Sequence, residues 1–163
     1  MEPPRTVTSY IIRQFAPPDL TAVMTINKKY LPENYPAGFF MRQYKEFPEA
    51  FLVAEADEKI VGYVMCRLEK GISSFQFKYY NRGHIVSIAI SPKYRRQKIG
   101  TNLLKKAVEA IKQRGIKEIF LEVRVTNSSA IDLYEKEGFT KTKVIPRYYR
   151  DGESAYVMAK KLG

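Results

Sequence analysis

Hydrophobic residues recur at helical spacing most clearly in the second half of the chain. Within Gly100–Arg114 they occupy one face, while lysines and Glu109 occupy the other, so the pattern predicts an amphipathic helix. The residues of the apolar face are Leu103, Leu104, Ala107, Val108 and Ile111. Short runs rich in β-branched and aromatic residues predict strands. These runs are Tyr10–Phe15, Phe51–Ala56, Ile60–Arg67, His84–Ile90, Glu118–Val125, Thr140–Ile145 and Ala155–Lys160.

Turn and capping residues place three further helices. The chain from Pro17 opens a helix that runs to about Tyr30, and a short helix follows at Phe39–Phe47. We expect Asn127 to cap a helix that ends just before Gly138. The order of elements is then strand, two helices, three strands, helix, strand, helix and two strands. Strands that alternate with helices in this way predict a mixed sheet covered by helices, an α/β (α+β) fold.

The segment Lys70–Arg82 is polar and aromatic, and its pattern favours neither strand nor helix. The remainder of the chain, residues 9–163, is about one domain in length, and we expect residues 1–8 to form a flexible arm. No apolar run approaches the roughly 18 residues that a membrane span needs. Cys66 is the only cysteine, which excludes an intrachain disulfide. These features, without a secretory leader or a metal-binding motif, predict a cytoplasmic protein.

The most informative segment is Ser91–Thr101, between the buried strand His84–Ile90 and the clearest helix. The first turn of a helix carries unsatisfied N–H groups and a partial positive charge. Together with Arg95 and Arg96, these groups predict an anion site that suits a pyrophosphate. An ordinary basic turn is the alternative.

This segment resembles the acetyl-CoA motif of the GNAT superfamily, which has Arg or Gln, two residues, Gly, one residue, then Gly or Ala. Arg95, Lys98 and Gly100 occupy the three key positions, so lysine stands where the family has its first glycine. Since the N-terminus of a helix does not itself require a positive φ, we expect Lys98 to donate its N–H there despite its Cβ.

Five other segments resemble the archaeal Ard-type enzymes, which are similar to the catalytic subunit of the NatA complex and to RimI-type enzymes. The segments are Leu31–Tyr35, Gly83–Ile90, Leu121–Asn127, Ala130–Phe139 and Arg147–Glu153. The resemblance implies a GNAT fold, with a mixed, mostly antiparallel sheet of about seven strands flanked by about four helices. It also implies transfer of an acetyl group from acetyl-CoA to the α-amino group of protein N-termini, by direct attack in a ternary complex.

Three residues match the catalytic positions of that family. Glu33 and His84 would orient or deprotonate the substrate amine, and Tyr134 would protonate the departing thiolate. An α-amino group has a pKa near 8, so roughly a tenth is neutral at pH 7, and modest base assistance is enough. The structural alternatives are a solvated loop carboxylate for Glu33, a backbone-bonded strand-edge residue for His84 and a core aromatic for Tyr134.

The resemblance further assigns the binding residues. The cofactor would contact backbone N–H groups of Ile88, Ala89 and Ile90, the loop residues Arg95, Arg96, Gln97, Lys98, Ile99, Gly100 and Thr101, and the helix residues Asn127 and Tyr134. The peptide would contact Glu33, Tyr35, Arg124, Tyr148 and Tyr149. Surface tyrosines with no binding role are the alternative, since the chain has 12 tyrosines.

The net charge of +11 attracts anions but does not choose a partner. It is compatible with association with the ribosome; no sequence-specific nucleic acid and no membrane are expected as partners. Two rival functions remain: acetylation of lysine side chains, and a non-catalytic basic module that binds RNA or the ribosome. The preferred N-terminal residues, the oligomeric state and any auxiliary subunit are left open.

Overall fold

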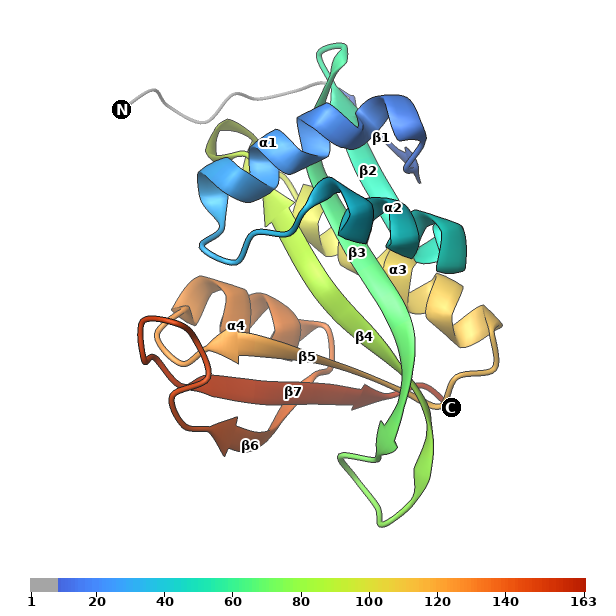
Figure 1. The fold of residues 1–163 in the computed structure, drawn as a ribbon, viewed down its shortest axis with the longest axis vertical. Coiled ribbons are helices and arrows are strands. Elements are labelled where there is room, and N and C mark those ends of the chain that lie inside the picture. Colours follow the sequence, from blue (N-terminus) through green and yellow to red (C-terminus); the bar gives the residue numbers. More distant parts are fainter. Residues whose placement is uncertain (1–8) are drawn as a thin grey trace. The chain divides into compact units, whose positions relative to one another are not determined.

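The computed structural model describes residues 9–163, which form one seven-stranded sheet and four α-helices (Figure 1). The strands are β1 Ile11–Gln14, β2 Phe51–Ala56, β3 Lys59–Ile72, β4 Tyr79–Ile90, β5 Glu118–Arg124, β6 Thr140–Ile145 and β7 Ala155–Lys161. The helices are α1 Leu20–Tyr30, α2 Ala37–Glu46, α3 Ile99–Gln113 and α4 Ser128–Lys136. The strand order is β1-β2-β3-β4-β5-β7-β6. The arm predicted for residues 1–8 lies outside the described residues.

The sheet is mixed and mostly antiparallel, as the sequence predicted. The β4–β5 pair is parallel, with Gly83 opposite Ile119 and His84 opposite Phe120. Three other pairs, β1–β2, β2–β3 and β6–β7, are antiparallel, and so is β5–β7. The predicted order of strands and helices is therefore confirmed, with ends displaced by a few residues. The described part of the chain divides into two compact units, residues 9–67 with Val86–Ala110 and Leu68–Ile85 with residues 111–163.

The first unit has an aromatic core. Phe15 and Phe51 stack with their ring centroids 4.1 Å apart, and Phe40 and Tyr63 are completely buried beside them. The β2–β3 hairpin closes through Asp57 and Glu58, whose φ values are 51° and 63°. Two left-handed residues in succession match the right-handed twist of the flanking strands, which explains the tight connection.

The second unit is organised by β5, whose register with β7 runs along its whole length, from Glu118 to Arg124. Asn127 caps α4 as predicted, because its side-chain oxygen accepts a hydrogen bond from the N–H of Ala130 at 3.3 Å. Gly138, at φ 91°, ends the helix in the left-handed region. The capping residues visible in the sequence therefore set both ends of α4.

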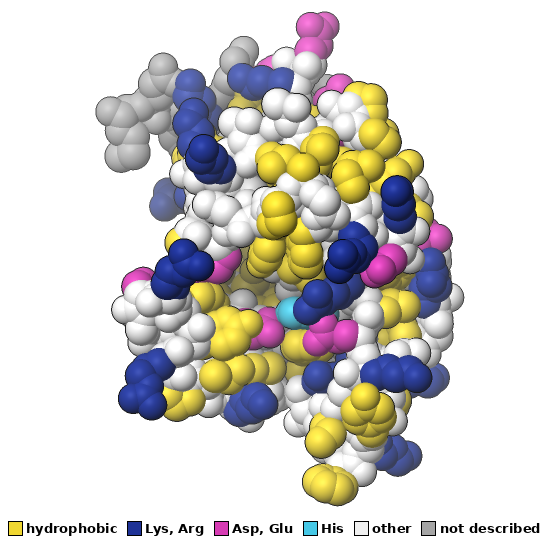
Figure 2. All heavy atoms as spheres, in the orientation of Figure 1, with side chains coloured by type: hydrophobic (Ala, Val, Ile, Leu, Met, Phe, Trp, Pro, Cys, Tyr) yellow, Lys and Arg dark blue, Asp and Glu magenta, His cyan; other side chains and the backbone are white. Residues whose placement is uncertain are grey.

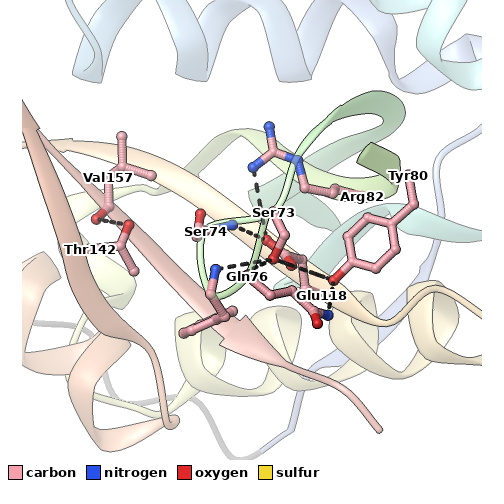
Figure 3. Close-up of polar contacts among 9 residues, drawn as sticks. Ser73, Ser74, Gln76, Tyr80, Arg82, Glu118, Thr142 and Val157 are labelled. Atoms are coloured by element: carbon pink, nitrogen blue, oxygen red, sulfur yellow. Dashed lines mark hydrogen bonds and ion pairs between the residues drawn. The ribbon is translucent and has the colours of Figure 1, made fainter. Parts of the chain in front are cut away.

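The segment Lys70–Arg82, which had no assignment, forms the far end of the β3–β4 hairpin. Strand β3 runs on to Ile72 and β4 begins at Tyr79. The cause is tertiary: the buried carboxylate of Glu118 on β5 accepts hydrogen bonds from the side chain of Ser73 and from Tyr80 Oη, the latter at 2.6 Å (Figure 3). The local sequence pattern cannot predict Glu118 as the partner, because it lies far along the chain from Ser73 and Tyr80.

Candidate active site

The connection between β4 and α3 presents backbone donors. The N–H of Asn102 donates to the carbonyl oxygen of Lys98 at 2.9 Å, which is the first hydrogen bond of the helix. The N–H groups of residues 99–101 therefore precede any helical acceptor. Beside them, Arg95 is exposed and donates from Nε to the carbonyl oxygen of Ile90 at 3.0 Å. Donors, dipole and guanidinium groups together make residues 95–101 a candidate phosphate-binding loop, which we call the phosphate loop.

Two residues of this phosphate loop have positive φ values, 62° at Arg96 and 64° at Lys98. The expectation that position 98 needs no positive φ was wrong. The 3-10 turn Pro92–Tyr94 ends directly before the loop and α3 begins at Ile99, so the chain must change direction within four residues. Left-handed turns achieve this and gather successive N–H groups on one side. A residue with a Cβ pays roughly 1–2 kcal/mol for such a conformation.

Glu33 and Tyr35 lie in a first-unit loop that is fixed by a buried side chain, Asn27 of α1. Asn27 is 1% exposed, and its Nδ2 donates to the carbonyl oxygen of Glu33 at 3.0 Å and to Tyr63 Oη at 3.1 Å. Tyr63 Oη in turn shares a hydrogen bond with Ser87 Oγ at 2.6 Å. Burial raises the pKa of Tyr63 to about 12, so this chain of polar groups stays neutral.

Sequence reasoning missed Asn27 as the residue that positions this loop. A signal was present, because Asn27 directly follows Ile26 and lies one turn from Val23, both buried. A polar side chain on the buried face of a helix requires a hydrogen-bond partner. The pattern could not identify that partner as the loop.

His84 is held between two carboxylates in the second unit. Its Nε2 lies 2.7 Å from Glu122 Oε2 and its Nδ1 lies 3.1 Å from Glu69 Oε2. The ring, 8% exposed, stacks on Phe120 with centroids 4.4 Å apart. Figure 2 shows the only histidine, in cyan, with acidic side chains beside it. We call these four residues the histidine cluster.

The cluster favours the protonated ring. Burial lowers the pKa of His84, but the hydrogen bonds from its ring to Glu122 and Glu69, with their charges, outweigh burial and raise the pKa above its ordinary value. A neutral imidazole has one N–H, so only an imidazolium can donate to both carboxylates. Among residues 9–163, no group of histidine, cysteine and carboxylate side chains could hold a metal ion, this cluster included.

Glu69 and Glu122 are the second omission of the sequence reasoning. Glu122 interrupts the apolar run Ile119–Val123, which is a visible signal for a partnered charge. Its partner follows from register: His84 lies opposite Phe120 on β5, and Glu122 lies two residues further along the same face.

Tyr134 and Asn127 belong to α4, two helical turns apart. Tyr134 is 6% exposed and packs against Phe139, with centroids 6.0 Å apart. Burial raises the pKa of Tyr134 to about 12. The phenol is therefore a weaker acid than a solvated tyrosine. Asn127 is exposed. Its Oδ1 accepts the capping hydrogen bond, and its side-chain nitrogen takes no part in that bond.

Arg124, at the end of β5, organises the β6–β7 connection. Its Nη1 lies 2.8 Å from Asp151 Oδ2 and 2.7 Å from Glu153 Oε2, and its guanidinium lies over the ring of Tyr149 at 4.1 Å. Tyr149 meets Tyr148 edge to face, with centroids 4.9 Å apart. Three of the predicted peptide-contacting residues thus form one layered group, in which Arg124 is anchored by two carboxylates.

The predicted site residues fall into two groups. The first unit contains Glu33, Tyr35, Ile88, Ala89, Ile90 and residues 95–101. The second unit contains His84, Arg124, Asn127, Tyr134, Tyr148 and Tyr149. Within the first unit the structure joins Glu33 and Tyr35 through Asn27, and within the second it joins Arg124 to the two tyrosines.

The seven-stranded mixed sheet and its four helices define an α/β protein, and the candidate phosphate loop lies between strand β4 and helix α3. A model of the acetyltransferase (GNAT) family matches residues 20–139, and the chain belongs to this family. No helix among residues 9–163 has the length and apolar character to cross a membrane.

The chain is similar to an N-alpha-acetyltransferase of Sulfurisphaera tokodaii, with 47% identity over 92% of each chain. Among solved structures it resembles Chaetomium thermophilum Naa20 in complex with a bisubstrate analogue, with 31% identity, a TM-score of 0.83 and coverage of 93% of this chain and 86% of that one. It also resembles Arabidopsis thaliana Naa50 in complex with the bisubstrate analogue CoA-Ac-MVNAL, with 27% identity, a TM-score of 0.81 and coverage of 94% and 99%.

Proposed function

We propose that this protein transfers an acetyl group from acetyl-CoA to the α-amino group of protein N-termini. The phosphate loop carries the proposal, because its backbone donors and arginines suit a diphosphate. The similarity to the Sulfurisphaera tokodaii N-alpha-acetyltransferase over nearly the whole chain supports the α-amino group as acceptor. The solved relative with CoA-Ac-MVNAL supports acetyl-CoA and a peptide as the two substrates.

The residues present fit the coenzyme. Arg95 and Arg96 would neutralise the diphosphate, and the N–H groups of residues 97–101 would bond its oxygens. The exposed side-chain amide of Asn127 and the α4 surface beside it would contact the pantetheine arm of the coenzyme, which contains two amide groups. Acetyl-CoA would supply an acetyl group activated as a thioester. Its carbonyl oxygen would be held by N–H groups of Ile88–Ile90, in the part of β4 that continues beyond its last register pair with β5.

The amine proton requires an acceptor, for which Glu33 and the histidine cluster are our candidates. Because the pKa of His84 is raised, its ring keeps its proton to higher pH than an ordinary histidine, and the protonated ring cannot take another. We propose that His84 accepts the amine proton only after releasing one of its own. Glu122, at 2.7 Å, is then a positioning residue that sets the pH at which the ring becomes neutral.

We propose that Tyr134 supplies a hydrogen bond to the leaving thiolate. With a pKa of about 12, complete proton transfer to a thiolate whose acid has a pKa near 8.5 would be uphill by about 5 kcal/mol. A hydrogen bond that stabilises the developing charge, with the proton moving as the C–S bond breaks, fits this weak acid better than an isolated transfer.

We propose that Tyr35, Tyr148, Tyr149 and Arg124 contact the first residues of the peptide. Tyrosines give rigid surface with a polar tip, which suits recognition of a peptide backbone. The two carboxylates on Arg124 would keep that surface ordered before substrate arrives, which lowers the entropy lost on binding.

The substrate assignment is tested with radiolabelled acetyl-CoA and three peptides that differ only in one internal lysine and in the state of the N-terminus. One peptide has a free N-terminus and no lysine, the second has a formylated N-terminus and one internal lysine, and the third has a free N-terminus and the lysine. We expect label in the first and third peptides, with mass spectrometry placing the third peptide's label on its N-terminus. Label confined to the lysine would establish the rival lysine acetyltransferase.

Three further assignments stay predictions: a single domain over 9–163, a cytoplasmic location and association with the ribosome. The second is supported by the single cysteine of the chain, because disulfides are typical of proteins in oxidising compartments and one cysteine allows no intrachain disulfide. The net charge of +11 supports the third.

A further inference from the structure

The second unit contains a basic pocket that the acetyl-transfer chemistry does not use. It has a volume of about 540 Å³ and is lined by Phe75, Gln76, Lys78, Tyr80, Lys117, Lys161 and Gly163. The three lysines are exposed, and the Nζ of Lys161 lies over the ring of Phe75, 5.1 Å from its centroid. Within the described part of the chain, none of these lysines pairs with a carboxylate. We call this the lysine pocket.

The wall of the lysine pocket is held rigidly. Glu118, which is completely buried, accepts hydrogen bonds from the N–H of Ser74 at 2.9 Å and from Tyr80 Oη at 2.6 Å, as well as from Ser73 (Figure 3). Arg82 Nη1 lies 3.8 Å from the same carboxylate. The hydrogen bonds fix the position of Glu118, and the guanidinium of Arg82 opposes its negative charge. The end of the hairpin therefore holds Tyr80 in place in the wall of the pocket, beside the three exposed lysines.

The same hairpin exposes large apolar side chains. Phe77 is 98% exposed, Tyr79 69% and Ile72 57%, and all three flank the pocket residues in the sequence. Exposed rings next to lysines on a β-hairpin are the combination with which proteins bind single-stranded nucleic acid. Lysines contact the phosphates and aromatic faces stack with bases.

We infer that the lysine pocket, with Phe77 and Tyr79, binds single-stranded nucleic acid. The phosphates lie against Lys78, Lys117 and Lys161, and the bases stack on the exposed rings. An acidic peptide would use the lysines but has no use for two solvent-exposed ring faces. An anionic membrane would contact the exposed rings but not a hollow behind them. A nucleic-acid strand uses both features. This binding is separate from acetyl transfer and does not depend on it.

The test measures fluorescence anisotropy of a labelled twelve-nucleotide oligouridylate over a range of salt concentrations. The pocket variant carries Lys78→Gln, Lys117→Gln and Lys161→Gln. A matched control removes the same charge elsewhere through Lys106→Gln, Lys112→Gln and Lys136→Gln, all exposed helix residues. We expect the pocket variant to bind at least about tenfold more weakly and to lose about 2 from the log–log salt slope. The control should stay within about threefold of the original protein.

A second variant, Phe77→Ser with Tyr79→Ser, tests stacking and leaves the charge unchanged. We expect about tenfold weaker binding of the oligonucleotide and unchanged binding of inorganic polyphosphate. The proposal would be overturned if the original protein did not bind the oligonucleotide, or if the pocket variant and its matched control lost the same amount of affinity. It would also be overturned if the Phe77→Ser, Tyr79→Ser variant bound the oligonucleotide as tightly as the original protein, or if the original protein bound vesicles of anionic lipid more tightly than the oligonucleotide. Circular dichroism and peptide acetylation, both expected to be unchanged, separate this result from the acetyltransferase assignment.

Discussion

The phosphate loop of the first unit and the histidine cluster of the second prepare for chemistry in different ways. The loop uses consecutive residues, 95–101, and offers mainly backbone N–H groups with two residues in the left-handed region. The histidine cluster uses side chains from three strands, at positions 69, 84, 120 and 122. Its chemical property is the raised pKa of His84, which the two carboxylates produce. A local motif therefore reveals the loop, whereas only strand register reveals the cluster. Mutations in the phosphate loop should therefore change the affinity for the coenzyme, and mutations in the histidine cluster should change the protonation of His84.

Replacement of His84 gives the largest expected effect. His84→Gln retains one hydrogen bond but removes the titrating ring, so we expect kcat to fall by about 100-fold with little change in the KM for acetyl-CoA. Steady-state kinetics with a saturating peptide measures both constants. A kcat within about threefold of the original would assign His84 to packing on Phe120.

Removal of both loop arginines should affect binding rather than turnover. For the double variant Arg95→Ala, Arg96→Ala we expect the Kd for CoA to rise by about 30-fold, since charge-assisted hydrogen bonds are lost. Isothermal titration calorimetry measures the Kd, and Lys106→Ala with Lys112→Ala removes the same charge from exposed positions of α3. Equal weakening in both pairs would show that general charge, and not the loop, attracts the coenzyme.

The carboxylate beside His84 should control its protonation. The charges that meet the ring are Glu69 and Glu122, and Arg82 lies across Phe120, 4.0 Å from that ring's centroid. Glu122→Gln removes the strongest of the interactions that raise the pKa of His84, so the pKa should fall. We expect the rising limb of kcat against pH to move to lower pH.

The same shift has a consequence for stability. A folded-state pKa above the unfolded value stabilises the fold below about pH 6.5, and this contribution disappears as the pH rises through the folded pKa. Glu122→Gln should reduce that pH dependence in urea titrations, whereas Glu46→Gln, an exposed change of equal charge, should not. An unmoved rate profile would assign the limb to a group other than His84.

The smallest expected effect is at Lys98, whose φ is 64°. Lys98→Gly relieves the left-handed strain but adds freedom to the unfolded chain, so we expect a net gain of about 0.5 kcal/mol in the free energy of unfolding. Lys98→Ala loses the same charge and keeps the strain, and it should give no gain. Chemical denaturation of both variants measures the difference. An alanine variant as stable as the glycine variant would show that the position is unstrained.

The order of elements, the α4 cap at Asn127 and the anion loop ahead of α3 were predictable from the sequence, because each depends on neighbours along the chain. The glycine-like conformation of Lys98 was not, because the residue type argued against it. The far end of the β3–β4 hairpin was not predictable either. Its sequence pattern favours neither strand nor helix, and the hydrogen bonds of Ser73 and Tyr80 to Glu118 fix its conformation.

The features that can be inferred from the order of residues are local: periodicity, caps and the donors of a helix N-terminus arise within a few residues. Which distant groups meet depends on how the chain folds. Asn27 of α1 meets Tyr63 of β3 in the core, and Glu69 and Glu122 enclose His84 because strand pairing brings β3, β4 and β5 side by side. The pKa of a histidine follows from its surroundings, and those surroundings exist only once the strands are in register.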